Sequence, residues 1–265
     1  MAKGDISYSH GRWWRDNGDG TASETSGPNT KKRPAPSKRD KIEGKPNQSR
    51  TVRAPVAAGI IITRPRVPQI ATSSTNTVVT NTEQLVDLTN SPTGVFSVVS
   101  TPLIPSSMAW LAALSDLYSK YRWRRLRLVY VPSCPTTTQG SAALSLGYDR
   151  FDTNPTSIQA MQQAYKAITF PAYAGYDGVK ALHSYGSVEG AVSIDFDTSR
   201  LEKTWYPCVG LASFNAFPTN VQTAYCPGTL FSGQQTASAG SVQFGTVHAQ
   251  YVIEFIEPIN PVQNG

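Results

Sequence analysis

The fold class is indicated most clearly by three segments that follow one another along the chain. They are Tyr130-Val-Pro-Ser-Cys-Pro-Thr-Thr-Thr-Gln-Gly140, Leu144-Ser-Leu-Gly-Tyr148 and Asp149-Arg-Phe-Asp-Thr-Asn-Pro155. Together they predict a strand, a long turn rich in Pro and Thr, a second strand, and a turn that carries two carboxylates. Segments of the same β-branched and apolar character lie on both sides of them. The stretch is therefore expected to lie within a larger β-sheet.

From residue 71 onward the pattern is that of a β protein, and two segments, Met108–Tyr121 and Ser157–Ala164, show helical spacing. About eight major strands joined by two short helices favour an all-β fold, an eight-stranded jelly-roll β-sandwich. The strand candidates are Thr77–Leu88, Gly94–Thr101, Trp123–Val131, Ala142–Tyr148, Ala167–Phe170, Val179–Leu182, Val188–Phe196, Pro207–Phe214, Gly228–Phe231 and Thr246–Ile256.

Charge is distributed unevenly along the 265 residues, whose net charge is +6. Residues 1–66 contain 14 Lys and Arg against 6 Asp and Glu, a net of +8, and residues 67–265 contain 10 against 12, a net of −2. A basic end beside a nearly neutral body indicates the charge of a binding partner rather than the fold. We expect a polyanion to bind the basic end.

Three regions follow from this composition: a basic arm at residues 1–52, a connecting arm at 53–70 and a β domain at 71–265. The arm has few aliphatic side chains, so it is predicted to be largely disordered in isolation. A solvated linker or localisation signal is one interpretation, and a polyanion-binding arm is the favoured one. Trp13 and Trp14 suit either base stacking or docking on a partner. The arm's candidate binding cations are Lys31, Lys32, Arg33, Lys38, Arg39, Lys41, Lys45, Arg50 and Arg53.

Catalytic motifs are absent from the sequence. The three histidines are isolated, the three cysteines suggest no metal site, and there is no Gly-x-Ser-x-Gly, phosphate loop or dinucleotide fingerprint. We therefore expect no enzyme, and a Cys–His nucleophile pair would need groups that only the fold could bring together. The sequence has no apolar run of 18 residues and no apolar signal core, so we expect no membrane partner.

The segment after Tyr121 alternates basic and apolar residues. The pattern predicts a strand with one basic and one apolar face, and Arg124 interrupts the alternation only locally. The basic residues are Arg122, Arg124, Arg125 and Arg127, and the apolar ones are Trp123, Leu126, Leu128 and Tyr130. The basic face has three interpretations that the sequence leaves open: a solvated surface, a subunit contact, or a surface turned toward a polyanion.

Asp149 and Asp152 form the one candidate metal site. Two anionic oxygen ligands three residues apart suit Ca²⁺, which takes six to eight oxygen ligands. The pair cannot complete such a shell, so carbonyls, water or a neighbouring subunit would have to supply the remainder. Aspartate at a strand end is also ordinary turn chemistry.

At these residues the sequence resembles the coat proteins of small icosahedral plant RNA viruses, specifically the shell domains of sobemoviruses and necroviruses. The resemblance covers most of residues 75–257. It rests on Trp110-Leu111, Ser119–Trp123, Tyr130–Ser141, Tyr148–Pro155 and Leu201–Pro207, which occur in the family's order.

The resemblance implies a jelly-roll shell domain that assembles with copies of itself into a T=3-type icosahedral shell. It implies that the basic arm faces genomic single-stranded RNA and that Asp149 and Asp152 bind Ca²⁺ between subunits. It places the protein in the virion, and in the host cytoplasm during assembly. We expect no protruding domain. The alternative is a cellular jelly-roll module, lectin-like, with a basic localisation tail.

Overall fold

The computed structural model describes residues 6–10, 12–17, 19, 21–25, 67–90, 95–184, 186–236 and 240–260. The chain divides into two units, Met1–Arg53 and Ala54–Gly265. The second unit contains the β domain expected from residue 71 onward.

The first unit contains a small antiparallel sheet in the order β1-β2-β3, formed by Ile6–Ser9, Arg12–Asp16 and Ala22–Thr25. In the turn between β2 and β3, the Thr21 amide donates to Asp19 Oδ1 at 2.9 Å. An exposed ion pair joins Arg12 on β2 to Glu24 on β3 at 3.0 Å. The sequence predicted no strand before residue 53, because segments of four or five largely polar residues show too few alternations to register as strands.

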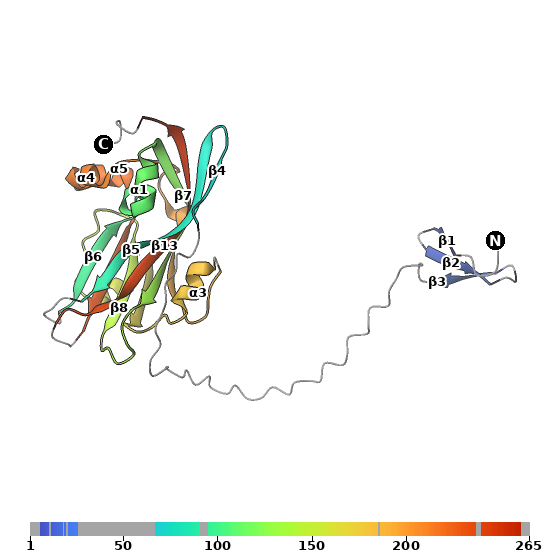
Figure 1. Ribbon diagram of the computed structural model, residues 1–265, viewed down its shortest axis with the longest axis horizontal. Coiled ribbons are helices and arrows are strands. Elements are labelled where there is room, and N and C mark those ends of the chain that lie inside the picture. The colour runs from blue at the N-terminus through green and yellow to red at the C-terminus, as the bar shows by residue number, and fades with distance from the viewer. Residues whose placement is uncertain are drawn as a thin grey trace. The chain divides into compact units, whose positions relative to one another are not determined.

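The second unit is built from two antiparallel sheets (Figure 1). One has the order β10-β7-β13-β5-β4, with β11 paired to β7, and the other has the order β6-β12-β8-β9. The strands are β4 Gln69–Thr72, β5 Asn76–Thr89, β6 Ser97–Pro102, β7 Tyr118–Pro132, β8 Ser141–Gly147, β9 Lys166–Pro171, β10 Val192–Phe196, β11 Tyr206–Pro207, β12 Thr229–Gln235 and β13 Gln243–Pro258.

Eight of these strands follow the jelly-roll pairing rule. Taken in chain order, the first pairs with the last (β5 with β13), the second with the seventh (β6 with β12), the third with the sixth (β7 with β10), and the fourth with the fifth (β8 with β9). This is the pattern of a long hairpin rolled into two facing sheets. The predicted eight-stranded jelly-roll β-sandwich is confirmed.

The core lies between the two sheets and is rich in aromatic residues. Tyr121, Tyr130, Phe214, Tyr251 and Phe255 are fully buried there. Their buried hydroxyls find partners: Tyr121 donates to the Tyr225 carbonyl at 2.8 Å and Tyr130 donates to the Ala172 carbonyl. Aromatic packing of this kind stabilises the core beyond the apolar area that it buries.

Helices fill the crossovers. They are the α-helices α1 Ala109–Ser115, α2 Ile158–Gln162, α3 Gly178–His183, α4 Leu211–Ala216 and α5 Thr219–Tyr225, and the 3₁₀ helices η1 Pro105–Ser107 and η2 Thr198–Arg200. Figure 1 shows α1, α4 and α5 together at one end of the sandwich, with α3 toward the other end. In the described residues, no helix is long and apolar enough to cross a membrane.

Three expectations about local structure were wrong. The helix expected over Met108–Tyr121 ends at Ser115, and Tyr118 already begins β7. The strand expected over Val179–Leu182 is helix α3. The strand expected over Pro207–Phe214 is only the two residues of β11, followed by α4.

The two strands that proved to be helical share a physical reason: an apolar run of four to eight residues has no period long enough to separate strand from helix. The surrounding structure decides instead. In α3, Ala181 and Leu182 pack on Val129 and Val131 on the outer face of β7, and an added Cβ on Gly178 would lie 2.5 Å from the Tyr130 carbonyl.

Candidate cation site and charged surface

The turn that carries Asp149 and Asp152 begins where β8 ends at Gly147. An added Cβ on Gly147 would lie 2.8 Å from the Phe231 ring, so a larger residue here would have to displace that ring. Asp149 Oδ1 accepts from the Phe151 amide at 2.9 Å, and the Asp152 amide donates to the Asp149 carbonyl at 3.4 Å. Both aspartates are exposed. The structure thus brings the two predicted metal ligands onto one tight surface turn.

Arg150, between the two aspartates, points the other way. Its Nε donates to Gln222 Oε1 at 2.9 Å and its Nη1 to Thr229 Oγ1 at 3.3 Å. Within the described part of the chain, neither Asp149 nor Asp152 has a Lys or Arg side chain at ion-pair distance. Among the described residues, the turn therefore presents two exposed carboxylates without a basic partner.

The turn supplies only part of a coordination shell. Among the described residues, no group of three or more His, Cys, Asp or Glu side chains could hold a metal ion. Asp149 and Glu202 line a hollow of about 40 Å³ beside the turn. The oxygen chemistry fits Ca²⁺, and the remaining ligands would have to be carbonyls, waters or groups of another subunit.

The predicted RNA-binding residues cannot be placed. Lys31, Lys32, Arg33, Lys38, Arg39, Lys41, Lys45, Arg50 and Arg53 all lie outside the described residues. Their assignment stays a prediction from the sequence.

The basic face of β7 has a partner that the sequence did not reveal. Glu254 on β13 is 2% exposed, and its carboxylate accepts from Arg124 Nε at 2.8 Å, from Arg122 Nε and from Asn76 Nδ2. Burial alone would raise the pKa of Glu254, but the bonds from Arg124, Arg122 and Asn76 and the charge of Arg122 hold it at about 2. The one available signal was a single acidic residue within the apolar run Thr246–Ile256.

A β-bulge explains why both arginines reach this carboxylate. The register between β13 and β7 shifts at Arg124: Val252 faces Arg125, while the next residue, Ile253, faces Trp123. Trp123 and Leu126 are both buried although they are three residues apart, which a strictly alternating strand would not allow. The local interruption that the sequence predicts at Arg124 is this bulge.

Arg127 is a further departure from a solvated basic face. It is buried, and it donates to the Gly186 carbonyl and to Ser193 Oγ, the latter at 2.8 Å, while Asp195 lies 3.8 Å away. Together with the bonds of Arg122 and Arg124, this shows that most of the arginine row stabilises the subunit itself.

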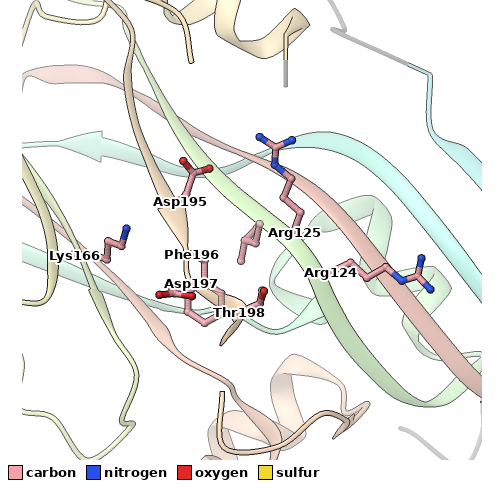
Figure 2. A pocket seen from close by; sticks show the side chains of 8 residues that line it. Arg124, Arg125, Lys166, Asp195, Phe196, Asp197 and Thr198 are labelled. Atoms are coloured by element: carbon pink, nitrogen blue, oxygen red, sulfur yellow. The ribbon is translucent and has the colours of Figure 1, made fainter. Parts of the chain in front are cut away.

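Next to this row lies an open hollow of about 390 Å³ (Figure 2). Its acids already have partners: Asp195 faces Arg127, and Asp197 Oδ1 accepts from the Ser199 amide at 3.1 Å. No histidine or cysteine lines it, so it holds no Cys–His pair. The hollow is lined by Arg124, Arg125, Leu126, Lys166, Asp195, Phe196, Asp197 and Thr198.

The cysteines are poorly suited to nucleophilic chemistry. Cys134, Cys208 and Cys226 are free thiols, and burial raises the pKa of each, that of Cys226 to about 11. A thiol in that state carries little thiolate near neutral pH. Their environment therefore fits a packing role.

Comparisons with known proteins agree with the fold. The sequence profile of the family described as "Viral coat protein (S domain)" matches residues 49–261. The capsid protein of Tobacco necrosis virus (strain D) is 43% identical over 215 residues, which cover 81% of this chain and 80% of that protein. The capsid protein of Tobacco necrosis virus (strain A) is 42% identical over 211 residues, covering 80% and 76%.

Solved structures give the same result. A tobacco necrosis virus structure matches with a TM-score of 0.75 and 42% identity, covering 80% of this chain and 96% of that one. The structure of Cocksfoot mottle virus matches with a TM-score of 0.64 at 19% identity, covering 69% and 96%, which supports the fold alone. With the family profile spanning the whole sandwich and a relative above 40% identity over four fifths of the chain, this protein belongs to the viral coat proteins of the S-domain family.

Proposed function

We propose that this coat protein assembles with copies of itself into an icosahedral shell of the T=3 type that encloses single-stranded RNA, with Ca²⁺ bound between subunits. One observation carries the proposal: the jelly-roll sandwich aligns with a tobacco necrosis virus structure over 80% of this chain and 96% of that one. A subunit of that extent, without a catalytic constellation among its described residues, suits tiling with identical copies.

The RNA part of the proposal rests on charge. Residues 26–53 hold nine Lys and Arg against Asp40 and Glu43, a net of +7, whereas residues 67–265 have a net of −2. Binding through phosphates needs no base readout and releases counterions from the RNA. If all nine cations engage, the logarithm of the RNA affinity should fall against the logarithm of the salt concentration with a slope of about −6.

To test this part, the nine cations of residues 26–53 are replaced together by glutamine in the full chain. We expect the shell domain to fold, as judged by circular dichroism, and the particles to lack RNA. Deletion of residues 1–25 is the control, because it removes three cations (Lys3, Arg12, Arg15) and four carboxylates (Asp5, Asp16, Asp19, Glu24) and keeps all nine. RNA-filled particles of normal size from the nine-fold variant would refute the proposal.

The cation part rests on the Asp149–Asp152 turn, whose carboxylates face outward without a basic partner among the described residues. Bound Ca²⁺ would neutralise these two carboxylates and any that an adjoining subunit brings near. We expect a chelator near neutral pH to loosen the shell and acid to restore it in part. The measurement is the sedimentation of particles at about pH 7.5, with and without chelator. Particles of the double variant Asp149→Asn, Asp152→Asn are the comparison. Unchanged sedimentation in chelator would contradict the cation site.

Self-assembly has a separate test. Size-exclusion chromatography of the purified full chain should give a particle-sized peak with nucleic-acid absorbance. A monomer or small oligomer indifferent to RNA at low salt would instead favour the lectin-like alternative.

A further inference from the structure

We propose that Arg150 is a positioning residue that holds the Asp149–Asp152 turn in its cation-binding form and ties it to helix α5. This inference rests on the cation site proposed above. Arg150 itself would contact no cation, since its guanidinium bonds Gln222 and Thr229 and forms no ion pair with either carboxylate among the described contacts.

The anchor of Arg150 is itself rigid. Gln222, on α5, is 8% exposed, and its Nε2 donates to the Phe214 carbonyl at 3.1 Å and to the Phe217 carbonyl at 3.0 Å. Thr229, the first residue of β12, is fully buried. The guanidinium therefore joins the turn to α5 and to β12 of the four-stranded sheet through acceptors that have little freedom to move.

Tyr148, directly before the turn, is held by the Asp197 amide at 2.8 Å and by stacking on Phe196, but residues 149–152 themselves have few bonds. Apart from Arg150, the bonds described for its residues are the 2.9 Å bond from the Phe151 amide to Asp149 Oδ1 and the 3.4 Å bond from the Asp152 amide to the Asp149 carbonyl. The Phe151 side chain is 60% exposed and packs little. Removing the guanidinium would release the backbone midway between the two ligands.

The acceptors of Arg150 are neutral, and this has an electrostatic consequence. A guanidinium free to move would pair with a neighbouring carboxylate in bidentate fashion and compete with a metal ion. Gln222 and Thr229 keep it engaged elsewhere, so that Asp149 and Asp152 stay available. The arrangement supplies fixed geometry without occupying the ligands.

A positioning role and a simple charge effect predict opposite changes in Ca²⁺ affinity when Arg150 is replaced. If Arg150 acted only as a nearby positive charge, Arg150→Met would tighten Ca²⁺ binding, because a repulsive charge is lost. If it positions the turn, the same substitution weakens binding. We expect the free Ca²⁺ concentration at half-saturation of assembled particles, measured by equilibrium dialysis near neutral pH, to rise about tenfold, which equals about 1.4 kcal/mol.

Arg200→Met is the matched control. Arg200 lines the same small hollow as Asp149, but its guanidinium lies over the Tyr165 ring, 3.4 Å from the centroid, and it makes no described bond to the turn. We expect Arg200→Met to leave Ca²⁺ affinity unchanged or slightly tighter. Arg150→Lys should rescue only in part, because one ammonium replaces a planar fork that bonds two acceptors.

Thr229→Val is a second variant in case Arg150→Met fails to fold, because it removes one acceptor of Arg150 and keeps the side-chain shape. We expect it to raise the free Ca²⁺ concentration at half-saturation as well, by a smaller factor. Unchanged or tighter Ca²⁺ binding in both folded variants would overturn the positioning role while leaving the cation site intact. Absence of Ca²⁺ binding by the wild-type particles would instead refute the cation site, and this inference with it.

Discussion

The perturbation with the best-defined energetic consequence is Glu254→Gln. Glu254 is 2% exposed and holds Arg122, Arg124 and Asn76 around one carboxylate. Glutamine keeps the shape, but it removes the charge and replaces one acceptor oxygen by a donor that faces guanidinium groups. Two basic side chains would then lose their anionic partner at the bulge that aligns β7 with β13.

A pKa of about 2, against an ordinary value of 4.5, corresponds to about 3 kcal/mol of preference for the ionised form in the folded state. Arg122 and Arg124 are 35% and 45% exposed, so water compensates part of their loss. We therefore expect a loss of about 2–3 kcal/mol in the free energy of unfolding, or about 4–12 °C in Tm for a domain of this size.

The sign of the pH dependence follows from the same shift. Because the folded-state pKa of Glu254 is depressed, its stabilisation is present above the unfolded value near 4.5 and is lost as the pH falls through that value toward 2. The difference in stability between wild type and Glu254→Gln should thus be full at neutral pH and shrink between about pH 4.5 and 2.

The assay is urea unfolding of the disassembled full-length chain, followed by tryptophan fluorescence. Glu257→Gln is the control: Glu257 lies three residues further on β13, but its pair with Lys120 at 2.9 Å is exposed, so the free energy of unfolding should fall much less than in Glu254→Gln. Equal losses in the free energy of unfolding for the two variants would show that burial does not strengthen the ion pairs of Glu254.

Two further substitutions test other parts of the fold. Gly245→Ala should lower the free energy of unfolding by about 1–3 kcal/mol, because the added Cβ would lie 2.3 Å from the Val131 carbonyl. Gly186→Ala should lower it little, because the nearest atom to its added Cβ is 3.6 Å away. Equal Tm values for the two variants would contradict this. His248→Gln should flatten the loss of stability below about pH 6.5, since burial lowers the pKa of His248 against the opposing charge of Asp87, and the unfolded chain therefore takes up the proton first. Unfolding curves between pH 7.5 and 5 check this, and an unaltered slope in the variant would rule out His248 as the source.

The strands of the sandwich were largely predictable. β5, β7, β8 and β13 are long runs of β-branched, aromatic and alternating residues, and their observed bounds differ from the predicted ones by at most five residues at either end. Their periodicity is a local property and survives whatever they pair with. The turn carrying Asp149 and Asp152 was predictable for the same reason, because Gly147 and the polar residues after it end the strand locally.

The short helices were not predictable in the same way. In α3 and α4, six residues each, the apolar pattern suits either secondary structure, and contacts with β7 or with α5 decide between them. Isolated helices of this length are unstable in water, so their existence depends on tertiary packing.

A β-sandwich with a basic arm could be inferred from the sequence alone, because strand periodicity, turn residues and charge distribution are properties of neighbouring residues in the chain. Only the tertiary structure decided which charges pair. Glu254 meets Arg122 across 132 residues of sequence and Arg150 meets Gln222 across 72. A local pattern encodes which way a side chain points from its own strand, but it does not encode the partner, because that partner is brought near only when the rolled hairpin closes.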